Sequence, residues 1–410
     1  MIQKPRGTRD FLPEEMSQRR FIENKMRAVA ASFGYGEVVT PMFEEQELFT
    51  LKSGDGIIGE MYAFEDKGGR KIALRPEITA AVSRAYVNEA QVAPKPLRWF
   101  YFAECFRYER PQKGRYRQFW QFGCELIGAD SAEADAEIIS LAYELLKSSG
   151  VRFVLKIGHL KPMKSVLSKL DAISQKKVMA ALDKRDMEIL KNTLDSIESP
   201  ELYEPLEKLI NAESLSEVFE ASGDIEEKDR IIKTFELLDA MGIPYQLNFG
   251  IARGLDYYTG MVFEGFADNL GAENQILGGG VYRLAHLFGG KDTPSCGFAI
   301  GFDRVMVSLG EIIPNPKPIA AVISTPESRK AAYTAAAKFR ESGITAVMDV
   351  MDRGFGAQIS SAVKSGASYA VIIGEREADA GTVTLKNLSS SEQKEMKIQD
   401  AVLEVLNGNS

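Results

Sequence analysis

The chain contains very little of two residue types that support many kinds of catalysis. Among its 410 residues there are two histidines, His159 and His286, and three cysteines, Cys105, Cys124 and Cys296. So few histidines make a histidine-based metal site or acid–base pair hard to build. Three widely spaced cysteines form neither a disulfide framework nor a zinc signature. We therefore expect the chemistry to depend on other residue types, with the cysteines as small buried side chains.

Long apolar runs are also missing. No stretch of 18 or more apolar residues suggests a membrane span, and the N-terminal MIQKPRGTRD lacks the apolar segment of a secretory signal. With 45% hydrophobic and 26% charged residues, the composition is typical of a soluble globular protein, which we expect in the cytoplasm. The net charge of −8 argues against indiscriminate nucleic-acid binding but leaves room for an RNA partner at a local basic surface.

The order of predicted strands and helices divides the chain into two domains. Strand and turn signals dominate residues 1–311, except over about 160–240, where helical spacing and many charges predict a helical insertion. Ile312–Pro318 is a proline-rich linker. Beyond it strands and helices alternate, which predicts a small α/β domain at 319–410. The expected fold class is α+β.

A long β-hairpin predicted over 98–128 is the clearest candidate for a binding surface. Side chains of equal parity share a face of a strand, and one face of this hairpin is almost entirely apolar. The other combines small residues with Arg107, Gln121 and Glu125. Arg107 suits a phosphate, and the other two suit a cation or an imidazole. A solvated face with surface ion pairs is an equally open interpretation.

The loop of this hairpin is the most basic part of an acidic protein. Within eight residues it carries Arg110, Lys113, Arg115 and Arg117. A solvated charged turn is the usual explanation for such a run. Next to a polar face, the same charges would attract ATP phosphates or an RNA backbone.

Several segments resemble those of one enzyme family. FRYERPQKGRYRQFWQFGCE resembles motif 2 of the class II aminoacyl-tRNA synthetases, in the form found in histidyl-tRNA synthetases. VVTPMFEE, with Pro41, resembles motif 1, and CGFAIGFDR resembles motif 3. The opening KPRGTRDFLPEE also matches, and RGLDYYTGMVFE is similar to a peptide characteristic of histidyl-tRNA synthetases. The resemblance implies a class II antiparallel-sheet catalytic domain at 1–311, with an insertion at 160–240, and an anticodon-binding domain at 319–410.

The resemblance also implies an activity: a ligase that activates L-histidine with ATP, supplied as Mg-ATP, and transfers it to tRNA(His). The motif 1 proline implies a homodimer. Arg107 and Arg253 would act in catalysis on either side of the α-phosphate, where two guanidiniums stabilise the negative pentavalent transition state. ATP would be bound by Arg107, Glu109, Arg115, Phe119 and Arg304. Histidine would be bound by Glu77, Thr79, Arg107, Gln121, Glu125, Arg253, Tyr257 and Tyr258.

Two of these residues also have a purely structural interpretation. Glu77 and Thr79 supply a carboxylate and a hydroxyl that suit the substrate ammonium, but they stand at a strand-to-helix junction where such residues often cap a helix.

The resemblance weakens at a few positions. Val281 and Arg283 stand where the family commonly has arginine and aspartate, and Ile78 stands where many members have glycine. In the C-terminal domain DRGFGAQ replaces a run of lysines.

Two alternatives therefore stay open at the level of the sequence. One is a non-catalytic regulatory subunit of histidine biosynthesis, a class that tends to lose the arginines and the C-terminal domain. The other is a class II synthetase for threonine, proline or glycine.

Overall fold

The computed structural model of the chain divides into two compact units, Met1–Ile312 and Ile313–Ser410. The residues that it describes are 1–110, 114–183, 186–250, 257–268, 270, 274–310, 312 and 319–408. Within these ranges no helix is long and apolar enough to cross a membrane.

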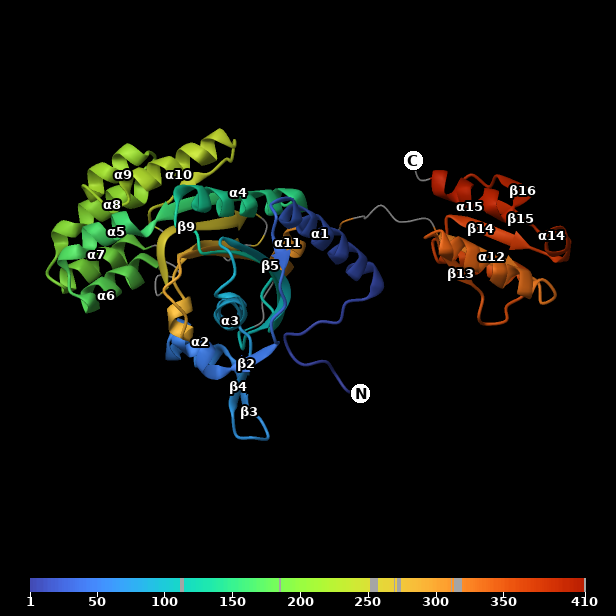
Figure 1. The fold of residues 1–410 in the computed structure, drawn as a ribbon, viewed down its shortest axis with the longest axis horizontal. Coiled ribbons are helices and arrows are strands. Elements are labelled where there is room, and N and C mark those ends of the chain that lie inside the picture. The colour runs from blue at the N-terminus through green and yellow to red at the C-terminus, as the bar shows by residue number, and fades with distance from the viewer. Residues whose placement is uncertain are drawn as a thin grey trace. The chain divides into compact units, whose positions relative to one another are not determined.

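An eight-stranded sheet forms the centre of the first unit (Figure 1). Its strand order is β1-β5-β6-β11-β10-β9-β7-β8, and all neighbours are antiparallel except the outer pairs β1–β5 and β7–β8. The strands are β1 (Gly36–Glu37), β5 (Leu97–Phe106), β6 (Gln118–Ile127), β7 (Phe153–His159), β8 (Gln246–Leu247), β9 (Tyr258–Ala267), β10 (Gln275–Tyr282) and β11 (Ser295–Gly301). The antiparallel sheet expected from the resemblance is confirmed.

Strands β5 and β6 form the predicted hairpin, and their register pairs residues of equal parity. Tyr101 lies opposite Gly123, and Ala103 lies opposite Gln121. The apolar face, which includes Phe100 and Phe122, is buried in the main core. The hairpin thus turns its small and polar side chains to the opposite side of the sheet, as the alternation predicts.

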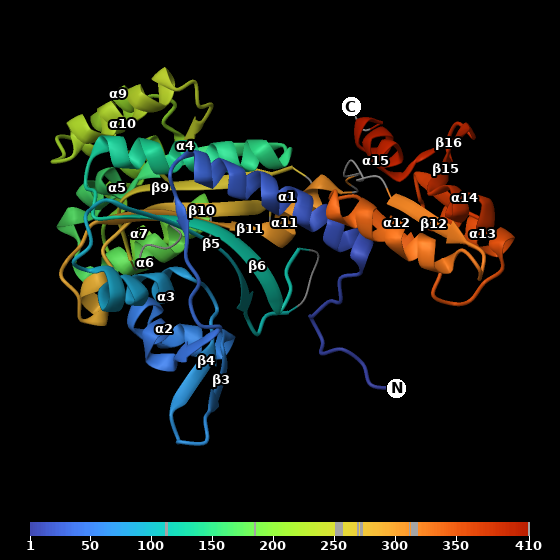
Figure 2. The ribbon, with the colours of Figure 1, turned by 45° about the vertical axis from the view of Figure 1, so that its right-hand side comes forward.

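Helices cover both faces of the large sheet. Figures 1 and 2 show α1 (Pro13–Ser32) and α4 (Ala132–Ser149) along one face, where they pack on the apolar side of the hairpin. α1 begins with proline, whose missing N–H costs nothing at a helix start. α4 begins at Ser131, whose hydroxyl accepts a hydrogen bond from the Ala134 amide, and ends at Gly150 in a left-handed conformation (φ 86°).

The opposite face is covered by shorter elements. They include a three-stranded sheet with the order β2-β4-β3. These elements are β2 (Phe43–Glu45), α2 (Gln46–Ser53), η1 (Asp55–Glu60), β3 (Tyr62–Glu65), β4 (Lys71–Leu74), α3 (Thr79–Ala85), η2 (Tyr86–Ala90) and η5 (Ala285–Phe288). The helix α11 (Phe302–Leu309), which follows β11, instead packs in the main core with α1 and α4. Because α3 packs over Tyr101 and Cys105, part of the polar side of the hairpin is closed to solvent.

A separate group of helices lies between β7 and β8 in the chain, at one side of the large sheet in Figure 1. Its members α5, α6, α7 and α8 contribute to a hydrophobic cluster of their own. The group comprises α5 (Leu160–Val166), η3 (Leu167–Lys169), α6 (Ala172–Asp183), α7 (Met187–Ser196), η4 (Pro200–Leu202), α8 (Tyr203–Asn211), α9 (Leu215–Ser222) and α10 (Lys228–Ala240).

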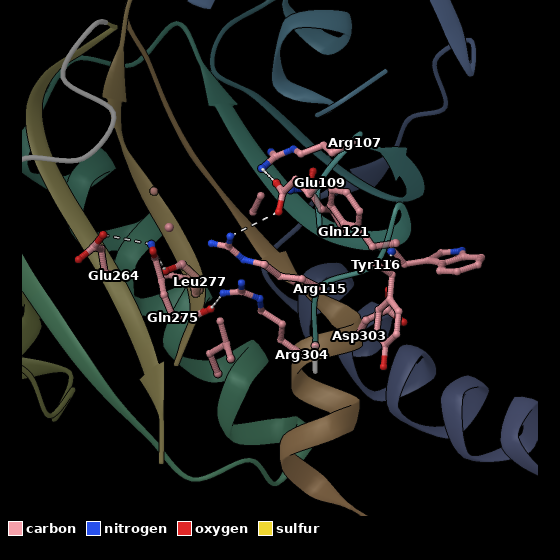
Figure 3. A pocket seen from close by; sticks show the side chains of 18 of the residues that line it. Arg107, Glu109, Arg115, Tyr116, Gln121, Glu264, Gln275, Leu277, Asp303 and Arg304 are labelled. Carbon is pink, nitrogen blue, oxygen red and sulfur yellow. Dashed lines mark hydrogen bonds and ion pairs between the residues drawn. The ribbon is translucent and has the colours of Figure 1, made fainter. Parts of the chain in front are cut away.

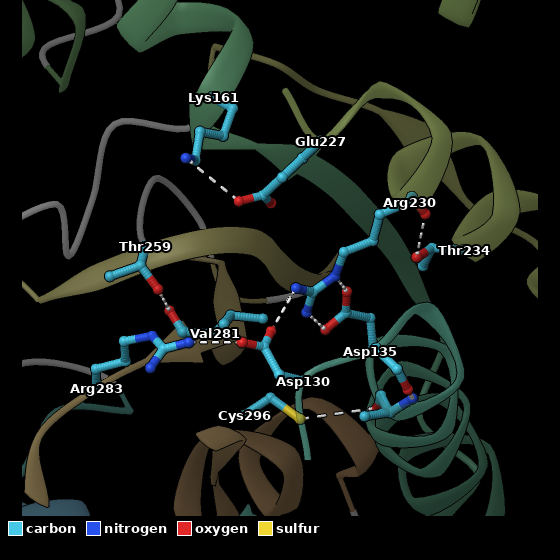
Figure 4. A network of polar contacts seen from close by, with 12 residues as sticks. Asp130, Asp135, Lys161, Glu227, Arg230, Thr234, Thr259, Val281, Arg283 and Cys296 are labelled. Carbon is cyan, nitrogen blue, oxygen red and sulfur yellow. Dashed lines mark hydrogen bonds and ion pairs between the residues drawn. The ribbon is translucent and has the colours of Figure 1, made fainter. Parts of the chain in front are cut away.

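An ion-pair network joins α10 to α4 and to the end of β10 (Figure 4). Arg230 donates to both oxygens of the buried Asp135, at 2.8 and 3.0 Å. It also donates to Asp130 at 2.5 Å. Asp130 in turn accepts from Arg283, which pairs with Asp292 as well. The family departure at Arg283 therefore has a structural role in linking β10 to the helical group.

Replacing Arg230 with methionine should destabilise the first unit, because Asp135 would be left buried without its partner. Removing one member of a buried pair costs about 3–5 kcal/mol of unfolding free energy. Lys233→Met is a matched control in the same helix, since the Lys233–Glu133 pair is exposed and should matter little. Chemical denaturation of both variants measures the difference. Equal losses would contradict the importance of the buried pair.

The second unit is a small sheet with helices on both faces. Its strand order is β13-β12-β14-β15-β16, with parallel pairing of β12 to β13 and β14 and antiparallel pairing beyond. Alternate residues of β12 enter two hydrophobic clusters, Ala320 and Val322 in one and Ala321 and Ile323 in the other. The elements are β12 (Ile319–Ser324), α12 (Arg329–Glu341), β13 (Thr345–Met348), α13 (Phe355–Lys364), β14 (Tyr369–Ile373), α14 (Glu375–Ala380), β15 (Thr382–Asn387), β16 (Gln393–Lys397) and α15 (Ile398–Asn407).

Candidate active site

A cavity of about 380 Å³ opens on the polar side of the large sheet. Its walls come from the β5–β6 hairpin, from β9, β10 and β11, and from the start of α11. Eight of the residues predicted from the sequence line it: Arg107, Glu109, Arg115, Phe119, Gln121, Tyr257, Tyr258 and Arg304. Segments far apart in the chain thus meet at one site.

The floor of the cavity contains small residues, among them Gly278, Gly279, Ala299 and Gly301. At Gly279 a Cβ atom would lie 2.5 Å from the Phe263 ring and 2.7 Å from the Gly297 carbonyl oxygen. Because Phe263 and Phe298 belong to the main core, glycine is required at position 279 for β10 to pack on the core side of the sheet.

Three arginines point into the cavity from different elements (Figure 3). The Arg107 Nε donates to the Pro76 carbonyl at 2.9 Å, which fixes the side chain at the cavity wall. Glu109 lies between Arg107 and Arg115, at 3.8 and 3.4 Å. Arg304 donates to the Gln275 carbonyl at 2.5 Å. This concentration of guanidiniums suits a polyanion such as a triphosphate.

Asp303 holds several parts of the site together, although sequence reasoning did not single it out. Its buried carboxylate accepts from Arg9 and Arg19 and from the Trp120 amide on β6, at 2.5, 2.7 and 2.7 Å. The neighbouring Arg304 is thereby held against the hairpin. The sequence offered one indication of its importance, because Asp303 directly precedes Arg304, which was predicted to bind ATP.

Glu125 is fully buried and does not line the cavity. The Tyr282 hydroxyl donates to it at 2.6 Å, and the Tyr101 hydroxyl lies 3.4 Å from its other oxygen. Burial raises the pKa of Glu125 to about 7, while hydrogen bonds from Tyr282 and Thr79 and the charge of Lys52 lower it. Tyr282, the direct partner of Glu125, was not among the residues predicted from the sequence.

Glu77 and Thr79 also lie away from the cavity wall, at the start of α3. Glu77 Oε1 accepts from the Ala80 amide at 3.1 Å, so the alternative capping role is present in the structure. Its other oxygen accepts from the Lys52 ammonium at 2.8 Å. That ammonium lies 4.5 Å from the centre of the Tyr257 ring, which does line the cavity. Glu77 is therefore adjacent to the cavity through Lys52 and Tyr257.

The aromatic pair predicted to border an imidazole is in place beside this group. The ring centres of Tyr257 and Tyr258 lie 4.2 Å apart, and Tyr257 also contacts Tyr282 edge-on at 6.4 Å. On the hairpin, the Cys105 thiol donates to Gln121 Oε1 at 3.2 Å and orients that amide. Arg253 lies outside the described residues, so its position opposite Arg107 stays a prediction.

Strands in antiparallel order, with arginines from a hairpin and from the helix after the last strand meeting over one cavity, define a class II aminoacyl-tRNA synthetase. The family described as Histidyl-tRNA synthetase matches residues 7–305, and the Anticodon binding domain family matches residues 312–407. The chain therefore belongs to the histidyl-tRNA synthetase family.

Individual relatives agree with this assignment. The histidine–tRNA ligase of Methanocorpusculum labreanum is 75% identical over 100% of this chain and 99% of its own. The histidine–tRNA ligase of Methanoregula boonei is 64% identical over 99% and 98%. The apo histidyl-tRNA synthetase structure from S. aureus is 28% identical over 99% of this chain and 100% of its own, with a TM-score of 0.74. These full-length matches do not favour the regulatory-subunit alternative.

Proposed function

We propose that the chain activates L-histidine with ATP to give histidyl-adenylate and then transfers the histidyl group to tRNA(His). The observation that carries the proposal is the meeting of Arg107, Arg115 and Arg304 in a cavity whose wall includes Tyr257 and Tyr258. A polyanion binds at the arginines, and an imidazole is bound beside the tyrosines.

The proposed chemistry is electrostatic. The histidine carboxylate attacks the α-phosphorus of ATP and pyrophosphate leaves, so no general base is needed. Negative charge grows on the phosphoryl oxygens, and Arg107 stabilises it together with Arg253. Arg304, Arg115 and Glu109 bind the nucleotide, and Phe119 lies against it.

Histidine is proposed to bind between the hairpin and β9. Gln121, Glu125, Tyr257 and Tyr258 surround the imidazole, and a carboxylate beside aromatic rings suits a ring N–H donor. Glu77 and Thr79 hold the α-ammonium, for which the closeness of Glu77 to Tyr257 through Lys52 is the support.

Mg²⁺ is proposed to accompany ATP. Glu109 and Glu264 both line the cavity, and Mg²⁺ in nucleotide sites is held by one or two carboxylates together with phosphate oxygens. The residues present therefore fit the ion, which would neutralise phosphate charge.

Amino-acid-dependent exchange of pyrophosphate into ATP tests the proposed activity. Exchange with histidine alone supports it. Exchange only with threonine, proline or glycine would replace it by another class II specificity, and no exchange with any amino acid would favour the regulatory subunit.

We further propose a homodimer in the cytoplasm. Pro41 of motif 1 is flanked by Val39, Met42 and Phe43, which are 86%, 44% and 54% exposed. Such apolar side chains are suited to burial against a second copy. Sedimentation at micromolar concentration distinguishes a dimer from a monomer.

For tRNA we propose three parts with separate roles: catalysis by 1–311, contact with the acceptor end by the insertion at 160–240, and anticodon binding by 319–410. Deleting residues 319–410 should weaken tRNA binding by more than about tenfold, while changing adenylate formation by less than about twofold. The reason is that the two units have separate cores. Filter binding and pyrophosphate exchange measure the two effects. Equal losses would contradict the division of roles.

A further inference from the structure

Lys52 is an unusual lysine because its side chain is buried. It lies on α2, and only 5% of the side chain is exposed. Lysine is almost never fully buried without a partner, since removing an ammonium from water is costly. Here Glu77 is that partner, at 2.8 Å, and the Tyr257 ring is a second favourable neighbour at 4.5 Å. Nothing in the chemistry of adenylation uses this residue.

Each oxygen of the carboxylate that Lys52 contacts already accepts one hydrogen bond. Glu77 Oε1 accepts from the Ala80 amide, and Oε2 accepts from Lys52. A further ammonium that binds Glu77 must displace Lys52, share Oε2 with it, or share Oε1 with the Ala80 amide, and in the last two cases it lies within a few ångströms of the Lys52 ammonium. Two like charges a few ångströms apart in a poorly solvated site repel each other strongly.

We propose that Lys52 is a specificity-determining residue that competes with the substrate α-ammonium for Glu77. The inference rests on the proposed role of Glu77 in histidine binding. Lys52 already contacts Glu77, so the contact that the amino group of histidine makes with Glu77 is partly offset by repulsion from the Lys52 ammonium. The affinity for histidine is thereby kept below what the carboxylate alone would give, and Lys52 does not oppose ligands that lack the amine.

The test compares two ligands that differ only in the α-amino group: L-histidine and 3-(imidazol-4-yl)propanoate. Calorimetry on the full-length protein gives the ratio of their dissociation constants, amine-free ligand over histidine. In Lys52→Met this ratio should rise by about tenfold, because Glu77 becomes available to the substrate ammonium alone. General damage to the pocket weakens both ligands and cancels in the ratio.

Three further variants sharpen the comparison. Lys52→Gln, which keeps a hydrogen-bond donor but removes the charge, should raise the ratio in the same direction and serves if the methionine variant does not fold. Lys52→Arg keeps the charge and should leave the ratio within about twofold of wild type. In a Glu77→Gln background, Lys52→Met should no longer change the ratio, since the shared partner is gone.

The outcomes separate this inference from the proposed function. An unchanged or lower ratio in both Lys52→Met and Lys52→Gln, with histidine-dependent pyrophosphate exchange by the wild type intact, overturns the role of Lys52 alone. A ratio near one in Lys52→Met as well as in the wild type would show that Glu77 does not recognise the amine, and would overturn the inference together with that part of the site. A wild type that neither binds histidine nor supports exchange would refute the proposed function itself.

Discussion

Arg107→Ala should slow histidyl-adenylate formation by about 10²–10³-fold, the usual cost of removing one preorganised group that stabilises a charged transition state. Arg107 is well placed for that role because its Nε is fixed on the Pro76 carbonyl and its side chain is 32% exposed in the cavity. The stacked neighbour Phe119, at 5.4 Å, further restricts the guanidinium. Little of the arginine's orientation therefore has to change when the reaction occurs.

Single-turnover formation of adenylate at saturating ATP and histidine measures this effect. Arg70→Ala is a suitable control because Arg70 is 74% exposed in the β3–β4 turn, where it pairs with Asp66. Loss of one surface arginine there should leave the rate unchanged. If Arg107→Ala raised the KM for ATP but kept the single-turnover rate, Arg107 would bind the ground state and would have no part in the transition state.

The hairpin shows why part of the site could be predicted from the sequence. Alternation of side chains along a strand is a local property, so the parity of Arg107, Gln121 and Glu125 placed them on one face before any partner strand was known. The exposure of that face to solvent could not be predicted from the local sequence pattern. The packing of α3 over Tyr101 and Cys105 closes part of that face to solvent, and it depends on contacts between segments distant in the chain.

Tyr282 and the strand order illustrate the same limit. Tyr282 reaches Glu125 across 157 residues of sequence because β11 lies between β6 and β10 in the sheet. No local pattern predicts that neighbour relation. Lys52 did leave a signal, since it follows Leu48 by four residues and Phe49 by three, which puts it on the buried side of α2. A lysine is ordinarily exposed, and its buried partner Glu77 comes from another element.

In the C-terminal unit the sequence pattern is clearer in the first strands than in the last. The strands β12, β13 and β14 are parallel and rich in apolar residues, which makes them recognisable, whereas the antiparallel β15 and β16 have a weaker pattern. β16 carries exposed Gln393, Lys394 and Glu395 at the edge of the sheet, and its polar sequence resembles a loop. Edge strands are often polar because an apolar edge would promote aggregation.

Glu125→Gln should weaken histidine binding by about 10–100-fold, because a charge-assisted hydrogen bond to the imidazole is replaced by a neutral one. The substitution keeps the shape of the side chain, and the amide oxygen still accepts from Tyr282 while its nitrogen can donate to the Tyr101 hydroxyl. The carboxylate is tightly enclosed, since a Cβ atom on the neighbouring Gly297 would lie 1.7 Å from Glu125 Oε2. Calorimetric titration with histidine measures the loss. Wild-type affinity in a folded variant would remove Glu125 from the histidine pocket.

The same variant should change how stability depends on pH. The pKa of Glu125 is raised from an ordinary 4.5 to about 7, chiefly by burial, so between these values the folded protein binds a proton that the unfolded chain has lost. The free energy of unfolding contributed by this group therefore falls as pH rises through the window and is fully lost above about pH 7. Glutamine does not titrate, so Glu125→Gln should gain stability relative to wild type between about pH 5 and about pH 8. Chemical denaturation of both proteins at the two pH values measures the change. If the free energies of unfolding of the two proteins differed by the same amount at both pH values, Glu125 would titrate in the folded protein as it does in the unfolded chain, in spite of its burial beside Tyr282.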